Sequence, residues 1–126
     1  MANPNKAKAK GTRWESDVRD YLNGALGLVD GDGRFFDPTD PHNVRRQAQQ
    51  GRADVGDLWA DPFVLECKAE RSYDLAGYVR QAEREAAAAG FPFGAAAVKR
   101  PRAAVGDGYA VMSLRTFAQV IRYMRG

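Results

Sequence analysis

Two oppositely charged side chains, Glu66 and Lys68, stand in a stretch that otherwise has the composition of a buried β-strand, DPFVLECKAE at residues 61–70. Side chains alternate between the two faces of a strand, so Glu66 and Lys68 share one face. Burying these charges costs free energy unless they are paired, hydrated or bound to a ligand. One interpretation is a plain ion pair at the strand end, which contributes only about 0–1 kcal/mol when exposed. The apolar run before Glu66 favours a partly buried pair with a function.

Asp57 precedes this strand by a turn at Asp61–Pro62, and a hairpin here predicts that the side chains of Asp57 and Glu66 meet. Two neighbouring carboxylates repel each other strongly where the dielectric constant is low. Mg²⁺ or Mn²⁺ relieves that repulsion because both ions prefer oxygen ligands. Lys68 would then lie beside the metal, able to hold a water molecule or offset charge on a phosphate. The pattern predicts phosphodiester hydrolysis, with Asp54 as the alternative to Asp57.

The composition suits one domain whose partner is a polyanion. The chain has 126 residues, 44% of them apolar, and a formal net charge of +3. A chain of this size can bury a core without disulfides or metals. It shows neither an apolar stretch long enough for a membrane span nor a signal-peptide pattern, so we expect no membrane partner and a cytoplasmic location. The single cysteine, Cys67, excludes an intramolecular disulfide, and Cys67 with the lone His42 is too small a ligand set for zinc.

The hydrophobic pattern predicts an α/β domain. We expect a flexible basic arm over residues 1–12 and a single domain over residues 13–126. The first helix should begin with Thr12 as N-cap and Glu15 at the capping-box position. Strands are expected near residues 44–46, 55–59, 63–68, 95–98 and 109–112, with helices over 74–90 and after Ser113. This αβββαβ order predicts a central mixed sheet of four to five strands flanked by helices, with strands 63–68 and 95–98 parallel.

The motif GDLWADPFVLECK resembles the core of the PD-(D/E)XK nuclease superfamily, in which an acid at a strand start is followed by Glu-x-Lys in the next strand. The resemblance spans residues 12–122 and points to the small phage and archaeal Holliday junction resolvase-like members. It implies a restriction-endonuclease-like fold and a homodimeric endonuclease that cuts branched DNA with Mg²⁺ or Mn²⁺. It implies that the catalytic residues are Glu15, Asp57, Glu66, Lys68 and Gln81, and that the metal ligands are Asp57, Glu66, the backbone carbonyl of Cys67 and Glu15.

Basic residues outside this motif are candidates for contacts to DNA phosphates. They lie near the N-terminus, in the middle of the chain and after the strand at residues 95–98, and they are Lys8, Lys10, Arg13, Arg34, Arg45, Arg46, Lys99, Arg100 and Arg102. A solvated surface charge explains each of them equally well. Two alternatives to a resolvase stay open: another nuclease of the same superfamily, acting in repair or restriction, and a catalytically inert DNA-binding protein with the same fold.

Overall fold

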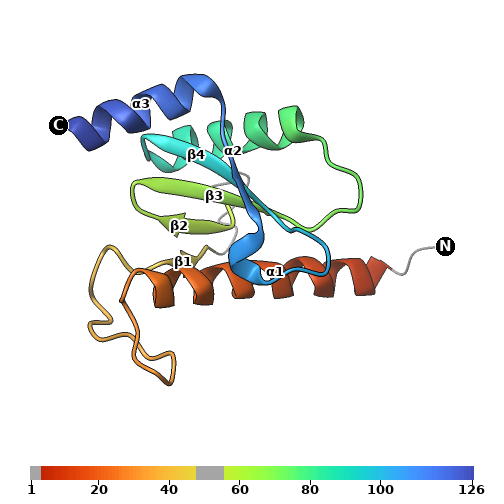
Figure 1. The fold of residues 1–126 in the computed structure, drawn as a ribbon, viewed down its shortest axis with the longest axis horizontal. Helices are drawn as coiled ribbons and strands as arrows, with labels where there is room; N and C mark the ends of the chain where they lie inside the picture. The colour runs from red at the N-terminus through yellow and green to blue at the C-terminus, as the bar shows by residue number, and fades with distance from the viewer. Residues whose placement is uncertain (1–3, 48–55) are drawn as a thin grey trace.

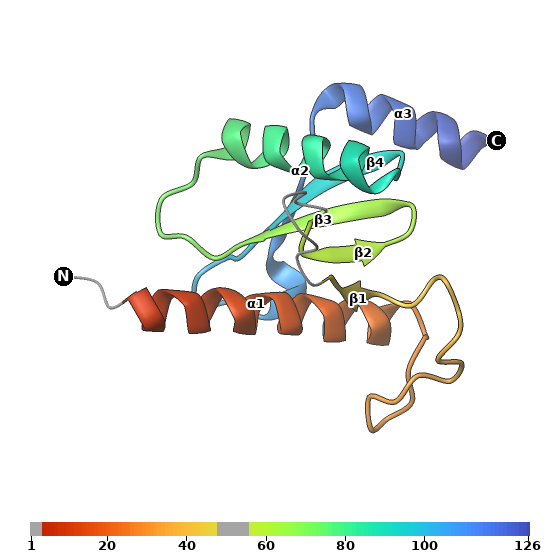
Figure 2. The same ribbon diagram turned by 180° about the vertical axis from the view of Figure 1, so that it is seen from behind.

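The computed structural model describes residues 4–47 and 56–126, with side chains from residue 10 onward. A five-stranded sheet has the order β1-β2-β3-β4-β5, and three longer helices flank it. Helix α1 lies along one side of the sheet, and α2 and α3 lie on the other (Figures 1 and 2). The elements are α1 Pro4–Ala25, β1 Arg45–Arg46, β2 Leu58–Ala60, β3 Phe63–Lys68, α2 Leu75–Ala89, β4 Phe93–Val98, the short 3₁₀ helix η1 Val105–Asp107, β5 Tyr109–Val111 and α3 Leu114–Arg125.

The sheet is mixed, as expected from the order of the elements. Strands β1, β2 and β3 are antiparallel neighbours, β3 and β4 are parallel, and β5 returns antiparallel to β4. The parallel pair brings Lys68 at the end of β3 opposite Val98 at the end of β4. Strand β3 has the predicted bounds, whereas β2 begins at Leu58 and β4 begins two residues before Ala95. The protein is therefore an α/β domain with a mixed five-stranded sheet.

The core is divided between the two faces of the sheet. On the α1 face, Trp14 and Val18 pack with Leu65 and with alanines of β4. On the α2 face, Tyr78 packs with Ala96 and Val98. The alternation of β3 accounts for this division, because the apolar Leu65 faces α1 while Glu66 faces α2. The expected separation of apolar and charged faces in β3 is confirmed.

The start of the first helix differs from the expectation. Helix α1 begins at Pro4, so Thr12 lies inside it and is not its N-cap. The expected flexible arm is wrong for residues 4–12, which form the first turns of α1, and residues 1–3 lie outside the described part. Lysine and alanine are strong helix formers, and the run KAKAK extends the helix despite Gly11. A hydrogen bond from Trp14 Nε1 to the Ala97 carbonyl (2.9 Å) then ties α1 to β4.

The other helices begin and end where their capping residues predict. The side chain of Asp74 accepts a hydrogen bond from the Gly77 N–H at the start of α2, and Gly90 ends that helix in the left-handed conformation. The side chain of Ser113 accepts from the Thr116 N–H at the start of α3. In the described ranges, no helix is long and apolar enough to cross a membrane.

A buried asparagine holds the loop after α1 against the start of β1. The side-chain amide of Asn23 donates to the Val44 carbonyl and its oxygen accepts from the Val44 N–H, both at 2.9 Å. Within the loop, Val29 and Phe35 form an isolated antiparallel β-bridge. These contacts position Arg45, the first residue of β1, beside α1.

Candidate active site

Asp57 immediately precedes β2, next to the part of β3 that extends beyond the residues paired with β2. Its backbone N–H donates to the Leu65 carbonyl (3.1 Å), continuing the hairpin by one residue. Its Oδ2 accepts a hydrogen bond from the Cys67 N–H (2.8 Å), a backbone donor that β2 does not reach. The carboxylate of Asp57 is therefore held against the backbone of β3 at Cys67, next to Glu66, whose pKa its charge raises.

Glu66 is buried, with only 6% of its surface exposed, and it faces α2. Its Oε1 accepts from Gln81 Nε2 (3.1 Å) and lies 3.5 Å from Lys68 Nζ. The amide of Gln81 also donates to Glu85 Oε1 (3.0 Å). Among the described donors, none bonds Glu66 Oε2, although this oxygen is buried. The expected contact between Gln81 and the site is confirmed, and the structure adds Glu85.

The surroundings of Glu66 strongly favour its protonated form. Burial is the largest cause, followed by the contact with the Glu85 carboxyl and by the charges of Asp57 and Glu85, and together they raise the pKa of Glu66 to about 10. The ammonium of Lys68 opposes this increase but does not cancel it. With no further cation present, Glu66 is thus neutral at pH 7, whereas a bound cation would favour the carboxylate.

Glu15 reaches the same end of the hairpin from α1, on the other side of the sheet. Its Oε2 accepts two hydrogen bonds from the Arg46 guanidinium, at 3.0 and 3.2 Å. Burial and then the charge of Asp57 raise the pKa of Glu15, while Arg46 lowers it. Asp57 also raises the pKa of Glu66, so Asp57 lies between the acids of the two faces.

Glu15, Asp57, Glu66 and Lys68 lie near one another, but their side chains do not form a complete set of metal ligands. In the part of the chain that the structure describes, no three His, Cys, Asp or Glu side chains are arranged to hold a metal ion. The thiol of Cys67 is packed with the α1-face core, and burial raises its pKa, which suits a packing role for the side chain. A ligand role for the Cys67 carbonyl stays a prediction, and Asp54 lies outside the described residues.

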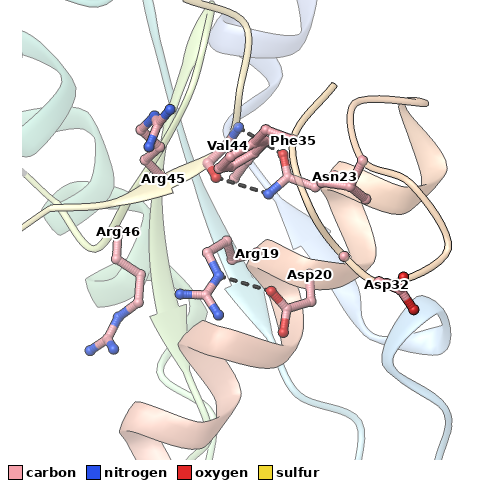
Figure 3. A pocket seen from close by; sticks show the side chains of 10 residues that line it. Arg19, Asp20, Asn23, Asp32, Phe35, Val44, Arg45 and Arg46 are labelled. Carbon is pink, nitrogen blue, oxygen red and sulfur yellow. Dashed lines mark hydrogen bonds and ion pairs between the residues drawn. The ribbon is translucent and has the colours of Figure 1, made fainter. Parts of the chain in front are cut away.

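A basic cavity of about 640 Å³ adjoins the acidic group. Two of its walls are Arg45 and Arg46 of β1, and a third is Arg19 of α1 (Figure 3). The Arg45 guanidinium lies over the Phe35 ring, 4.6 Å from its centroid, and Arg19 is paired with Asp20 (2.9 Å). Arg46 lines this cavity and also binds Glu15, so this one residue connects the cavity to the acidic group, while Asp20 and Asp32 line the cavity as well. Its arginine donors suit a phosphate or another anion.

Two residues of this region were not among the sequence candidates. Arg19 follows Glu15 by four residues, and Glu85 follows Gln81 by four residues, so each pair lies on one helix face. This spacing was visible in the sequence. What it could not show was that the face carrying Glu85 is the buried one, since Glu85 is only 2% exposed.

The other basic candidates are dispersed. The Lys99 N–H donates to the Lys68 carbonyl (2.9 Å), which places Lys99 at the same strand ends as Lys68, and its ammonium lies 6.0 Å from the Trp14 ring centroid. The side chain of Lys8 lies outside the described residues. The remaining five are exposed on α1, the loop after α1 and the loop after β4: Lys10, Arg13, Arg34, Arg100 and Arg102.

The chain matches no protein-family model, no curated protein and no solved structure.

Proposed function

We propose that this protein is a metal-dependent nuclease that hydrolyses phosphodiester bonds in DNA. The observation that carries the proposal is that Glu15 of α1, Asp57 just before β2, and Glu66 and Lys68 of β3 converge at one end of the β2–β3 hairpin. Acids with raised pKa values beside a lysine are typical of catalytic sites rather than of surface ion pairs. The resemblance of GDLWADPFVLECK to the PD-(D/E)XK core supports the same reaction and a restriction-endonuclease-like fold.

The donor chemistry of the site fits Mg²⁺ or Mn²⁺. Asp57, Glu66 and Glu15 offer hard carboxylate oxygens, and Oε2 of Glu66 is a buried oxygen to which no described group donates. Asp57 and Glu66 are the ligands that we propose, with the Cys67 carbonyl and Glu15 as the further donors that the resemblance implies; without the ion, the described side chains do not form a complete ligand set. When bound, a divalent ion polarises the phosphate and favours ionisation of an attacking water molecule.

The residues of the chain have separate roles in this proposal. Gln81 orients Glu66 through the 3.1 Å hydrogen bond to Oε1. Lys68, whose side chain is 18% exposed, is retained beside Glu66 and presents its ammonium to the phosphate or to the water that attacks it. Arg46 holds Glu15 in place by the paired hydrogen bonds to one oxygen.

The basic cavity gives the DNA backbone a place to bind next to the acids. Arginine forms paired hydrogen bonds with phosphate; Arg45 and Arg46 of β1 both line the cavity, and Arg46 binds Glu15. Lys99, which follows β4 and lies next to the end of β3, would contact the DNA backbone beyond Lys68. Such contacts are independent of base sequence, so they would supply affinity without selectivity.

Cleavage assays with defined variants test the proposed reaction. Glu66→Gln and Lys68→Ala should each reduce Mg²⁺-dependent cleavage of DNA by at least about 100-fold, since each removes a group acting at the reacting phosphate. Glu83→Gln and Arg84→Ala change charges on the same helix as Gln81, outside the acidic group, and serve as matched controls. Full cleavage by both Glu66→Gln and Lys68→Ala would show that this site is not the active site.

A branched substrate is the finer proposal, and it rests on the resemblance to Holliday junction resolvase-like enzymes. Cleavage of a four-way junction should exceed cleavage of a duplex with the same sequence. Equal cleavage of the two substrates would instead favour the other superfamily activities, in repair or restriction.

A catalytically inert DNA-binding protein is the second candidate. It is favoured by the contacts of Glu66, whose carboxyl is engaged by Gln81 and Glu85 on α2. If the unmodified protein binds DNA in a salt-dependent way but cuts neither substrate with Mg²⁺ or Mn²⁺, the second candidate replaces the first.

A further inference from the structure

Another cavity, of about 460 Å³, lies where the loop after α1 meets β2 and the segment that follows α2. Two aromatic side chains, Trp59 of β2 and Phe91 after α2, form part of its wall, and we call it the aromatic cavity. Their rings meet edge-on with centroids 5.0 Å apart, and both side chains are partly exposed. Aromatic rings with an accessible surface are typical of sites that stack a flat ligand.

Asn43 brings a buried hydrogen-bond acceptor to the same wall. It is 4% exposed, and its Nδ2 donates to the Asp37 carbonyl (2.8 Å). Because only the nitrogen of an amide can donate to a carbonyl, the other atom of this side chain is the oxygen. Oδ1 is buried, and no group in the described ranges donates to it. A buried acceptor without a donor costs free energy, so its presence in a cavity wall indicates a ligand with an N–H group.

The charged side chains of the aromatic cavity include acceptors and one strong donor. Asp61 and Asp40 line it, and Asp40 uses Oδ1 to accept from the His42 N–H (2.9 Å). Arg45, which lies opposite Trp59 in the sheet, lines both this cavity and the basic cavity, so it connects the two. These groups suit a flat ring that carries an amino group and is attached to a phosphate.

We propose that the aromatic cavity binds one unstacked DNA base that carries an exocyclic amino group. Adenine, cytosine and guanine carry such a group, whereas thymine does not. The ring stacks on Trp59, its amino group donates to Asn43 Oδ1, and the attached phosphate contacts Arg45. The inference rests on the proposed function, since it takes DNA to be the ligand, and it adds a contact that depends on the base.

The aromatic cavity is close to the acids along β2. Trp59 follows Asp57 by two residues, and the backbone of Asp57 continues the hairpin, so their Cα atoms are about 7 Å apart. A base in the cavity therefore belongs to a nucleotide near the phosphate at the acids. The free energy needed to unstack a base is smallest when the base is unpaired. A branch point or a single-stranded end would supply such a base more readily than a continuous duplex.

Binding of single-stranded oligonucleotides in the presence of a chelator tests the inference without cleavage. Each oligonucleotide is a dT run of one length whose central position is dA, dC, dT or an abasic site, so all four have the same charge. Central dA or dC should bind at least about 5-fold more tightly than central dT or the abasic site. Trp59→Leu should abolish this difference. Phe36→Leu removes an exposed ring outside the cavity and should keep the difference.

Tryptophan fluorescence provides a second measurement that needs no substitution. The chain has two tryptophans, and Trp14 is only 3% exposed in the core, so a stacked base should quench the emission of Trp59. Central dA or dC should quench more strongly than the abasic site.

Equal affinity and equal quenching for the four oligonucleotides would overturn the inference and leave the nuclease proposal intact. Absence of any DNA binding would overturn both. A preference for central dA or dC, in a protein that cuts no DNA with Mg²⁺ or Mn²⁺, would support the inference and reject the nuclease.

Discussion

Glu66 is a carboxyl group whose position imposes a stability cost on the protein. It is buried, it faces Glu85, and its pKa is raised to about 10. An ordinary core position would carry an apolar residue or a neutral amide. The retention of an acid here, hydrogen-bonded by Gln81 and next to Lys68, is the strongest indication at the level of single residues that this end of the hairpin has a function.

Replacing Glu66 by glutamine should stabilise the metal-free protein above about pH 5. A group whose pKa is higher in the folded state than in the unfolded state stabilises the fold only in its protonated form. The contribution of Glu66 to the free energy of unfolding is therefore complete below its unfolded pKa. It is lost progressively as the pH rises towards the folded pKa of about 10. At pH 7 the gain should be on the order of 1–3 kcal/mol. Denaturation in the presence of a chelator, at pH 4 and at pH 8, measures the difference.

The prediction fails if Glu66→Gln destabilises the protein equally at both pH values. Glu83→Gln is the control, because it removes an acid from α2 that is not part of the buried carboxyl group. Its effect should be small and should not depend on pH in this way.

At the level of the elements, the close approach of α2 to β4 brings Gln81 and Glu85 to Glu66. Gly94 permits that approach: a Cβ at this position would lie 2.3 Å from the carbonyl oxygen of Ala82. On the same face of β4, Ala96 packs with Tyr78 of α2. From the sequence, the small residues of β4 indicated only a strand. In the structure, Gly94 allows α2 to lie close enough to the sheet for Gln81 and Glu85 to contact Glu66.

Gly94→Ala should destabilise the fold by about 1–3 kcal/mol, because α2 must move away from β4 to admit the methyl group. Gly24→Ala is a matched control in α1, where a Cβ would have no neighbour within 4 Å. It should be neutral or stabilise the protein by up to about 1 kcal/mol, as alanine favours the helix. Urea denaturation of the two variants measures both effects, and equal stability of the two would contradict this account of the α2–β4 contact.

At the level of the whole molecule, separate segments contribute the basic residues of the cavity that Arg46 lines and of the end of β4. Arg45 and Arg46 come from β1, Arg19 from α1 and Lys99 from the end of β4. The net charge of +3 is modest, so this local arrangement, rather than the total charge, would attract a polyanion.

Arg45→Ala should weaken DNA binding to a similar extent for unrelated sequences, because a phosphate contact carries no base information. The slope of log affinity against log salt concentration should become shallower by about 1. Titrations of labelled DNA at several salt concentrations measure this slope, with Arg84→Ala on α2 as the control. An unchanged slope for Arg45→Ala would show that this cavity does not bind the DNA backbone.

Local patterns were sufficient to predict much of the architecture. The bounds of β3, the caps Asp74, Gly90 and Ser113, and the parallel β3–β4 pair follow from alternation, capping chemistry and the handedness of the crossover. The expected Thr12 cap failed, because a single possible capping residue cannot show that the preceding lysine–alanine run is also helical.

The sequence by itself determined that Glu66 and Lys68 share one face of β3 and that an acid before the turn, Asp57 or Asp54, lies near them, since this spacing is a property of two adjacent strands joined by a tight turn. Only the tertiary structure decided that Glu85 lies against Glu66, that Arg46 binds Glu15, and that Leu114 and Met124 of α3 are left exposed. Those outcomes depend on how helices pack onto the two faces of the sheet. Contacts between distant segments are set by the fit of whole surfaces, which no local spacing contains.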